Sequence, residues 1–331
     1  MTEPARPHHR AEGGFRNPWP NAEPAGFGNI LKWWWQRTRA GRPADPPRGS
    51  FATATPDLRA AVPGEIAATW IGHATVLLGI GPRRVLLDPM FGRHASPVPV
   101  SSLERWMPAR PTVADLPPLD LIGLSHNHYD HFDTGSIRAL ARAQPDVPWA
   151  VPLGLGPAVQ RLGGRTVVEF DWWDEQEVGG ILVGATPAQH FSARTPFDRN
   201  RTLWCGFTFR VEDRRVYFAG DTARHPEFEA IGRRFGPFDL ALIPIGAYEP
   251  RWFMRRVHCN PEDALGVYQD LLRAHPASTP VCLAIHWGTF KLTDEPLDEP
   301  PQRMRDRWRE AGLPDDRLWT LRHGETRVLK R

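Results

Sequence analysis

A short segment, residues 125–131, carries three histidines and one aspartate in the spacing His-x-His-x-Asp-His. Neutral imidazole and carboxylate are ligands that Zn²⁺ and similar divalent cations prefer. On a continuing strand, His126, His128 and Asp130 would share one face, because side chains repeat every two residues. On a tight loop, the two histidines could bind one metal while Asp130 and His131 turn to a second. Such a concentration of ligand types directly after an apolar strand predicts a metal site.

Three further candidate ligands each end an apolar run elsewhere in the chain: His190, Asp221 and His286. Gly220 permits close approach of the backbone before Asp221, and a carboxylate at that point can bridge two cations. Two cations about 3.5–4 Å apart can share a water molecule and lower its pKa toward neutrality. Together the candidate ligands predict a dinuclear hydrolytic centre.

The elements that must position these residues mix hairpins with strand–helix–strand units. Apolar runs bounded by turn residues predict strands at 67–70, 74–80, 84–88, 120–125, 149–152, 207–211, 216–218, 239–245 and 281–285. Helices are expected at 136–143, 156–162 and 261–273, with Asp133 and Asn260 as N-caps of the first and last. Because the candidate ligands follow strands, the pattern favours an α/β sandwich with a mixed sheet and functional loops at the strand ends.

The chain of 331 residues indicates one globular domain, residues 65–331, behind an N-terminal extension, residues 1–64. The first 30 or so residues are rich in Pro, Gly, Asn and charge, and they predict an extended arm whose Trp19 and Phe27 could dock on the body. The 14 tryptophans supply enough large apolar side chains for a sizeable core.

Composition also excludes several classes of protein. A net charge of only +3, with no long basic run, argues against a nucleic-acid partner. Cys205, Cys259 and Cys282 are too few and too scattered for a disulfide framework. The N-terminus has no apolar region typical of a signal peptide, and no apolar run reaches the length of a membrane span. We therefore expect a cytoplasmic protein.

The whole ligand pattern resembles the metallo-β-lactamase superfamily: the His-x-His-x-Asp-His motif, a lone His, Gly-Asp-Thr and a late His. The resemblance implies an αββα sandwich of two mixed β-sheets flanked by helices, with two divalent metal ions, taken as Zn²⁺, at one edge. Carried over residue by residue, it assigns His126, His128 and His190 to one metal, Asp130, His131 and His286 to the other, and Asp221 to both.

Longer strings resemble the N-acylphosphatidylethanolamine-hydrolysing phospholipase D family: residues 70–76, 171–173, 235–240, 244–254 and 285–290, with fainter similarity at 17–20. This resemblance implies a phosphodiesterase that cleaves such phospholipids with a metal-activated water. We take Asp130, Asp221 and His258 as candidate catalytic residues, and His258 and Tyr129 as candidate substrate-binding residues. In the family, a His after the Arg-Trp-Phe-Met string lies near the substrate phosphate. The residue before His258 is Val257, whereas the mammalian members of the family resemble a sequence with Gln at this position.

Several alternatives stay open at this point. A hydrolase of another small substrate, such as a lactone or a different phosphodiester, would use the same metals. His258 could simply precede the helix that begins after Asn260. Asp88 could support a ligand histidine or cap a turn. His73 is expected to support the fold near the site rather than bind metal.

The segment Trp33, Trp34 and Trp35, beside Lys32 and Arg37, has the composition of an interfacial membrane anchor. Peripheral contact with the inner face of the membrane is therefore one expectation. The alternative is that these indoles pack onto the body of the protein. A homodimer is also left open.

Overall fold

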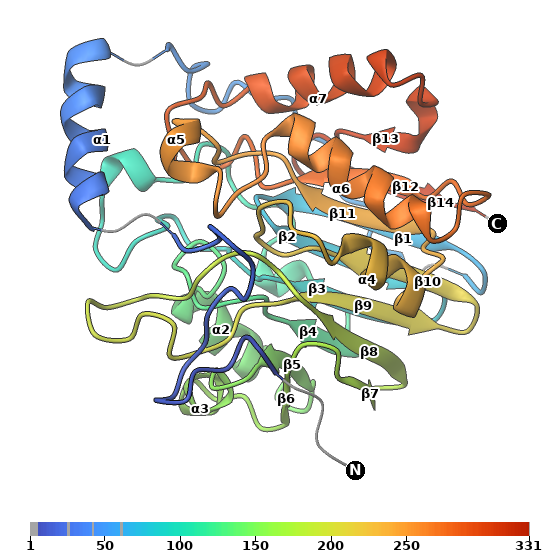
Figure 1. Ribbon diagram of the computed structural model, residues 1–331. Coiled ribbons are helices and arrows are strands. Elements are labelled where there is room, and N and C mark those ends of the chain that lie inside the picture. The colour runs from blue at the N-terminus through green and yellow to red at the C-terminus, as the bar shows by residue number, and fades with distance from the viewer. Residues whose placement is uncertain (1–5, 25–26, 42, 60–61, 331) are drawn as a thin grey trace.

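Two mixed β-sheets pack face to face, and helices cover their outer faces (Figure 1). This computed structural model describes residues 6–24, 27–41, 43–59 and 62–330. The αββα sandwich implied by the sequence resemblance is confirmed. Within the described residues, no helix is both long enough and apolar enough to cross a membrane.

The first sheet contains seven strands. In spatial order they are β14 (Thr326–Leu329), β1 (Ile66–Gly72), β2 (Thr75–Ile80), β3 (Arg83–Leu87), β4 (Leu121–Gly123), β5 (Trp149–Pro152) and β6 (Val167–Phe170). The pairs from β14 to β3 are antiparallel, and those from β3 to β6 are parallel. Strands β1, β3 and β4 therefore run in the same direction and end at the same edge.

The second sheet also contains seven strands. In spatial order they are β13 (Leu318–Trp319), β12 (Val281–Ile285), β11 (Leu240–Pro244), β10 (Arg214–Phe218), β9 (Gly206–Val211), β8 (Ile181–Thr186) and β7 (Glu175–Val178). Pairs from β7 to β10 are antiparallel, and those from β10 to β13 are parallel. Strands β8, β10 and β12 thus share one direction.

The helices are α1 (Phe27–Ala40), α2 (Thr134–Ala143), α3 (Gly156–Arg161), α4 (Phe228–Phe235), α5 (Arg251–Met254), α6 (Pro261–Arg273) and α7 (Glu299–Glu310). Short 3-10 turns occupy Ser101–Leu103, Val113–Asp115 and Asp315–Arg317. The Asp133 side chain accepts hydrogen bonds from the backbone N–H groups of Gly135 and Ser136, and the Asn260 side chain accepts one from Asp263. Both predicted N-caps are confirmed, and they set where α2 and α6 begin.

The main core lies between the sheets, where large side chains such as Trp70, Trp204 and Phe207 are almost fully buried. A second apolar cluster, including Ile137 and Val159, lies under α2 and α3. Because strands on both sides of the main core are buried, the backbone at their ends is held firmly. That rigidity is what a multi-ligand site needs.

Residues 6–24, here called the N-terminal arm, run across the body of the protein. Phe15 and Asn17 are buried, and the Phe15 N–H donates to the Asn200 carbonyl oxygen. Trp19 stacks on Trp172 of the body. The Phe27 side chain lies outside the described part of the chain.

Candidate metal centre

All candidate ligands follow the carboxyl ends of strands, which belong to both sheets. The His-x-His-x-Asp-His motif lies in the loop between β4 and α2, so it is a turn rather than a continuing strand. His190, Asp221 and His286 follow β8, β10 and β12 of the other sheet. The sandwich therefore brings residues far apart in the sequence to one edge.

Three histidines form the first cluster. The His128 Nδ1 atom lies 2.9 Å from His126 Nε2 and 3.1 Å from His190 Nε2. His190 Nδ1–H donates to the Val257 carbonyl oxygen at 2.9 Å, so in the neutral ring the Nε2 atom carries a lone pair. Lone pairs that converge in this way repel one another unless a cation lies between them. The cluster has the donor set of a metal site.

The second cluster contains Asp130, His131, His286 and also His73. The Asp130 Oδ2 atom lies 3.5 Å from His131 Nε2 and 3.6 Å from His286 Nε2. His73 Nε2 lies closer, at 2.8 Å from the same oxygen. A carboxylate and imidazoles at these separations could bind a second ion, with His73 orienting the carboxylate.

Asp221 lies between the two clusters. Its Oδ2 atom is 3.2 Å from His131 Nε2 and 3.7 Å from His190 Nε2, and its Oδ1 atom is 3.1 Å from His286 Nε2. One carboxylate therefore faces ligands of both clusters. This is the geometry expected of a bridging ligand.

Unpartnered buried atoms test whether this group of residues fits a metal. His131 Nε2, His286 Nε2 and Asp221 Oδ1 are buried and have no hydrogen-bond partner among the described residues. Buried polar atoms are almost always satisfied, because leaving one unpaired is unfavourable. These three atoms face one another, so bound cations would satisfy them together. The residues fit divalent metal ions.

The pKa values of the candidate ligands also differ between the two clusters. Burial and the neighbouring His190 lower the pKa of His128 to about 3, and burial with His131 keeps the pKa of His126 well below its usual value. Burial alone would raise the pKa of Asp221, but His131 and His286 hold it well below the usual range. In the second cluster, burial alone would lower the pKa values, but the Asp221 and Asp130 carboxylates raise the pKa of His131 well above its usual value and that of His286 to about 9. Neutral imidazoles and an ionised carboxylate are the forms that bind metal, so a cation in the second cluster would replace these protons.

Asp88 supports the site from behind. Its carboxylate accepts hydrogen bonds from His131 Nδ1 at 2.6 Å, from the Ser125 N–H at 2.7 Å and from the Ser125 hydroxyl at 2.6 Å. Of the two roles left open by the sequence, the structure shows contact with a candidate ligand. The carboxylate fixes the His131 tautomer and points Nε2 toward Asp221.

Strained backbone also concentrates here. His73, Asp88 and His286 all have positive φ, at 56°, 37° and 64°. Such conformations are unfavourable for residues other than Gly and persist where the surrounding structure imposes them. Gly220 also has a positive φ, 61°, which glycine adopts without strain. A Cβ added there would lie 2.9 Å from both the Cys205 carbonyl oxygen and the Ser125 Cβ. The expected close backbone approach before Asp221 is confirmed.

The two candidate substrate residues lie beside the clusters. His258 is 7% exposed, and its unpartnered Nδ1 atom is 3.9 Å from Asp221 Oδ2. Tyr129 is partly buried, and its hydroxyl donates to the Arg194 carbonyl oxygen at 2.9 Å while the Arg194 guanidinium lies over its ring. His258 therefore faces the centre, whereas the Tyr129 hydroxyl is engaged with a neighbouring loop.

Sequence reasoning did not place Asn17 at the site. Its side-chain amide donates to the carbonyl oxygen of His190 at 2.9 Å and to that of Ala22 at 3.0 Å. The only signal in the sequence is that residues 17–20 share the family resemblance. The three cysteines are buried and form no disulfide.

Comparison with known proteins agrees with this geometry. Residues 83–287 match the family model described as the β-lactamase superfamily domain. The chain belongs to the metallo-β-lactamase superfamily. Superfamily membership accounts for the αββα sandwich and, with the relatives below, makes the chain a metal-dependent hydrolase in class.

Two relatives in the superfamily have named activities. The chain is 39% identical, over 250 residues, to N-acyl-phosphatidylethanolamine-hydrolyzing phospholipase D 1 of Caenorhabditis elegans, covering 72% of this chain and 68% of that protein. It is 33% identical, over 271 residues, to the mitochondrial enzyme of the same description from Saccharomyces cerevisiae, covering 78% of this chain and 55% of that protein.

A solved structure supports the fold. The metallo hydrolase Igni18 from Ignicoccus hospitalis superposes with a TM-score of 0.60 at 19% identity, covering 81% of this chain and 99% of that one. At this identity the similarity concerns the fold alone.

Proposed function

We propose that the protein is a phospholipase D-type phosphodiesterase that hydrolyses N-acylphosphatidylethanolamine-like phospholipids. The observation that carries the proposal is the identity of 39% to a relative named for this activity, which spans most of the chain. The convergence of seven candidate ligands at one edge of the sandwich supports it. The reaction would release a phosphatidic acid and an N-acylethanolamine.

The proposed metal ligands are His126, His128, His190, Asp130, His131, His286 and Asp221, and the proposed ions are two Zn²⁺. Such ions, when bound, supply an electrophile for a phosphoryl oxygen and a water of lowered pKa. Asp221 would keep the two ligand clusters at a constant separation, because its two oxygens face both. Asp88 and Val257 would keep two ligand imidazoles in the tautomer that presents Nε2 to the centre.

His258 would contact the phosphate. Burial lowers the pKa of its imidazole well below the usual value, so at neutral pH the ring is uncharged and has one N–H to donate. A neutral N–H close to Asp221 can donate to a phosphoryl oxygen or to the leaving oxygen. Tyr129 would act at the rim of the site, through the loop that it contacts, rather than on the phosphate itself.

Two substitutions test the catalytic proposal. His128→Ala and Asp221→Ala should each abolish release of phosphatidic acid while the far-UV circular dichroism stays unchanged. His94→Ala removes an imidazole outside the clusters and should leave turnover intact. Wild-type turnover by either variant, in protein whose metal content has been measured, would overturn the proposal.

A lipid substrate requires an approach to the membrane, and we propose α1 as the contact. Trp33 packs on the body: it stacks on Phe253 with ring centroids 5.3 Å apart and donates to Asp294. Leu31 and Trp35, in contrast, are 58% and 51% exposed. These exposed α1 side chains could enter a lipid interface, with Arg39 beside Trp35.

Vesicle co-sedimentation tests this contact. Binding to vesicles of phosphatidylethanolamine and phosphatidylglycerol should weaken in a double variant with Leu31→Ala and Trp35→Ala. Val98 is also exposed, at 60%, and lies outside α1, so Val98→Ala provides the control. Equal binding by the double variant and the wild type would exclude α1 as the contact.

A further inference from the structure

His190 is the histidine of the first cluster that comes from the second sheet, whereas His126 and His128 both lie in the loop after β4 of the first sheet. It follows the end of β8, in a segment that forms an isolated bridge at Gln189 but no strand. The position of His190 relative to the other two histidines therefore depends on the contacts that hold this segment.

Asn17 of the N-terminal arm holds the backbone of His190. Its buried side-chain amide donates to the His190 carbonyl oxygen at 2.9 Å and to the Ala22 carbonyl oxygen at 3.0 Å. Both neighbours are acceptors, so it is the NH₂ group of the amide that faces them. The amide thus joins the backbone of the arm to the backbone of a candidate metal ligand.

The oxygen of the same amide indicates that these N–H groups have a specific role. Asn17 Oδ1 is buried and has no hydrogen-bond partner among the described residues. A buried unpaired oxygen is unfavourable, and a leucine of nearly the same shape would avoid it. The side chain therefore contributes through its two N–H donors rather than through packing alone.

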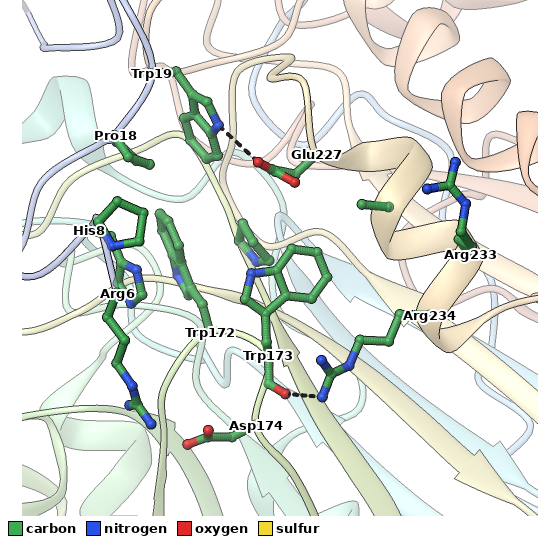
Figure 2. A pocket seen from close by; sticks show the side chains of 13 residues that line it. Arg6, His8, Pro18, Trp19, Trp172, Trp173, Asp174, Glu227, Arg233 and Arg234 are labelled. Atoms are coloured by element: carbon green, nitrogen blue, oxygen red, sulfur yellow. Dashed lines mark hydrogen bonds between the residues drawn. The ribbon is translucent and has the colours of Figure 1, made fainter. Parts of the chain in front are cut away.

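Contacts on both sides of Asn17 keep the arm on the body. Before it, His8 Nε2–H donates to the buried Asp171 carboxylate at 2.6 Å. After it, Trp19 stacks on Trp172 with ring centroids 5.6 Å apart. Figure 2 shows His8 and Trp19 of the arm beside Trp172 of the body. Because the arm is held at both points, the amide between them has a fixed position from which to hold His190.

We propose that Asn17 is a positioning residue for the metal ligand His190. Its amide fixes the His190 backbone, and the Val257 carbonyl oxygen orients the ring. Together they keep His190 Nε2 at 3.1 Å from His128 Nδ1. The N-terminal arm is then part of the framework that holds the metal centre. This proposal rests on the proposed metal ligands but not on the phospholipid substrate.

The two clusters should respond differently when this contact is lost. Asn17 contacts a ligand of the first cluster, whereas His131 of the second cluster is oriented by Asp88. Removal of the Asn17 amide should therefore weaken the binding of one metal ion much more than the binding of the other.

Zinc titration of the metal-free full-length protein, in competition with a chromophoric chelator, tests the proposal. Asn17→Leu removes both N–H donors with little change in volume and adds no charge near the centre. It should weaken one of the two zinc equivalents by roughly 10–100-fold, the range typical when a partner of a metal ligand is lost, and leave the other near its wild-type value. The visible absorption of the cobalt-substituted protein should change as well, because it depends on the geometry of the ligands.

Two further variants at the same position extend the test. Asn17→Ser, whose hydroxyl cannot bridge both carbonyl oxygens, should shift the zinc affinity in the same direction as Asn17→Leu. Asn17→Gln keeps the NH₂ group and should lose less affinity than either.

A matched control separates positioning from a general loss of stability. Phe15→Leu loosens the same arm at a buried position but leaves the Asn17 amide in place. It should bind both zinc equivalents as the wild type does, even where urea unfolding shows an equal loss of stability. Wild-type zinc affinities with an unchanged cobalt spectrum in Asn17→Leu, or an equal loss of affinity in Phe15→Leu, would overturn the role of Asn17. A wild type that binds fewer than two equivalents would instead contradict the proposed metal centre.

Discussion

Replacement of Asp88 by Asn is the sharpest test of how the metal centre is supported. The Asp88 carboxylate is fully buried, and its three hydrogen-bond partners, His131 Nδ1–H and the N–H and O–H of Ser125, are all donors. Asn keeps the shape but turns one acceptor oxygen into an NH₂ donor. In either orientation of the amide, at least one buried donor then faces another donor.

The magnitude follows from that mismatch. Loss of one hydrogen bond to a charged group makes the metal-binding orientation of His131 less favourable by about 1.5–3 kcal/mol. This corresponds to a decrease of roughly 10–100-fold in zinc affinity. Competition with a chromophoric chelator at neutral pH measures that affinity directly. Asp133→Asn is the matched control, because Asn caps a helix as well as Asp and the residue lies outside both clusters. Wild-type zinc affinity in Asp88→Asn would refute the supporting role of this carboxylate.

Two further predictions concern stability. Burial, followed by the charge of Arg105, lowers the pKa of His323 to about 3 in the folded protein, so protonation below the unfolded value of about 6.5 favours unfolding. Stability contributed by the neutral ring is complete above that value and declines by about 1.4 kcal/mol per pH unit as the pH falls toward 3. Urea unfolding of His323→Phe should therefore show a shallower acid dependence than the wild type, and identical slopes would contradict this origin. Gly220→Ala should destabilise the fold by about 1–3 kcal/mol, because the added Cβ meets Cys205 and Ser125 in a left-handed conformation; an unchanged midpoint would show that the loop relaxes freely.

Local chemistry explains why candidate metal residues could be proposed from the sequence. Four of the seven candidate ligands lie within one short turn, and the other three each follow a buried apolar strand. Parallel strands of one sheet end at a common edge, so separate strand ends predict a shared site. The N-caps Asp133 and Asn260 were predictable for the same reason, since a cap depends on neighbours within one turn.

Other features depended on contacts that no local pattern encodes. Asn17 and His190 are 173 positions apart, and nothing in either neighbourhood announces the hydrogen bond between them. His73 was expected near the site, but its partner was not: the turn between β1 and β2 places His73 Nε2 2.8 Å from Asp130 Oδ2. Strand β7 has a polar, largely exposed sequence, Glu175–Val178, and forms because it pairs with β8. Tertiary pairing overrides weak local preference there.

The tryptophan segment shows how a composition argument can be refined by geometry. Trp33 and Trp35 are two positions apart on α1, and each residue of a helix turns about 100°, so the two indoles point to nearly opposite sides. One packs on Phe253 and the other faces solvent. Trp33 therefore fits the interpretation that the segment packs onto the body, and Trp35 fits the interpretation that it is exposed.

Hydrolysis of N-acylphosphatidylethanolamine in water enriched in the heavy oxygen isotope tests the central claim most directly. Attack of water on phosphorus forms a new phosphorus–oxygen bond and breaks the bond to the ethanolamine oxygen, which takes up a proton. The zinc-loaded wild type should therefore release phosphatidic acid that carries one heavy oxygen per phosphate, together with unlabelled N-acylethanolamine. Failure to release phosphatidic acid, or label found in the N-acylethanolamine, would contradict a phospholipase D-type phosphodiesterase.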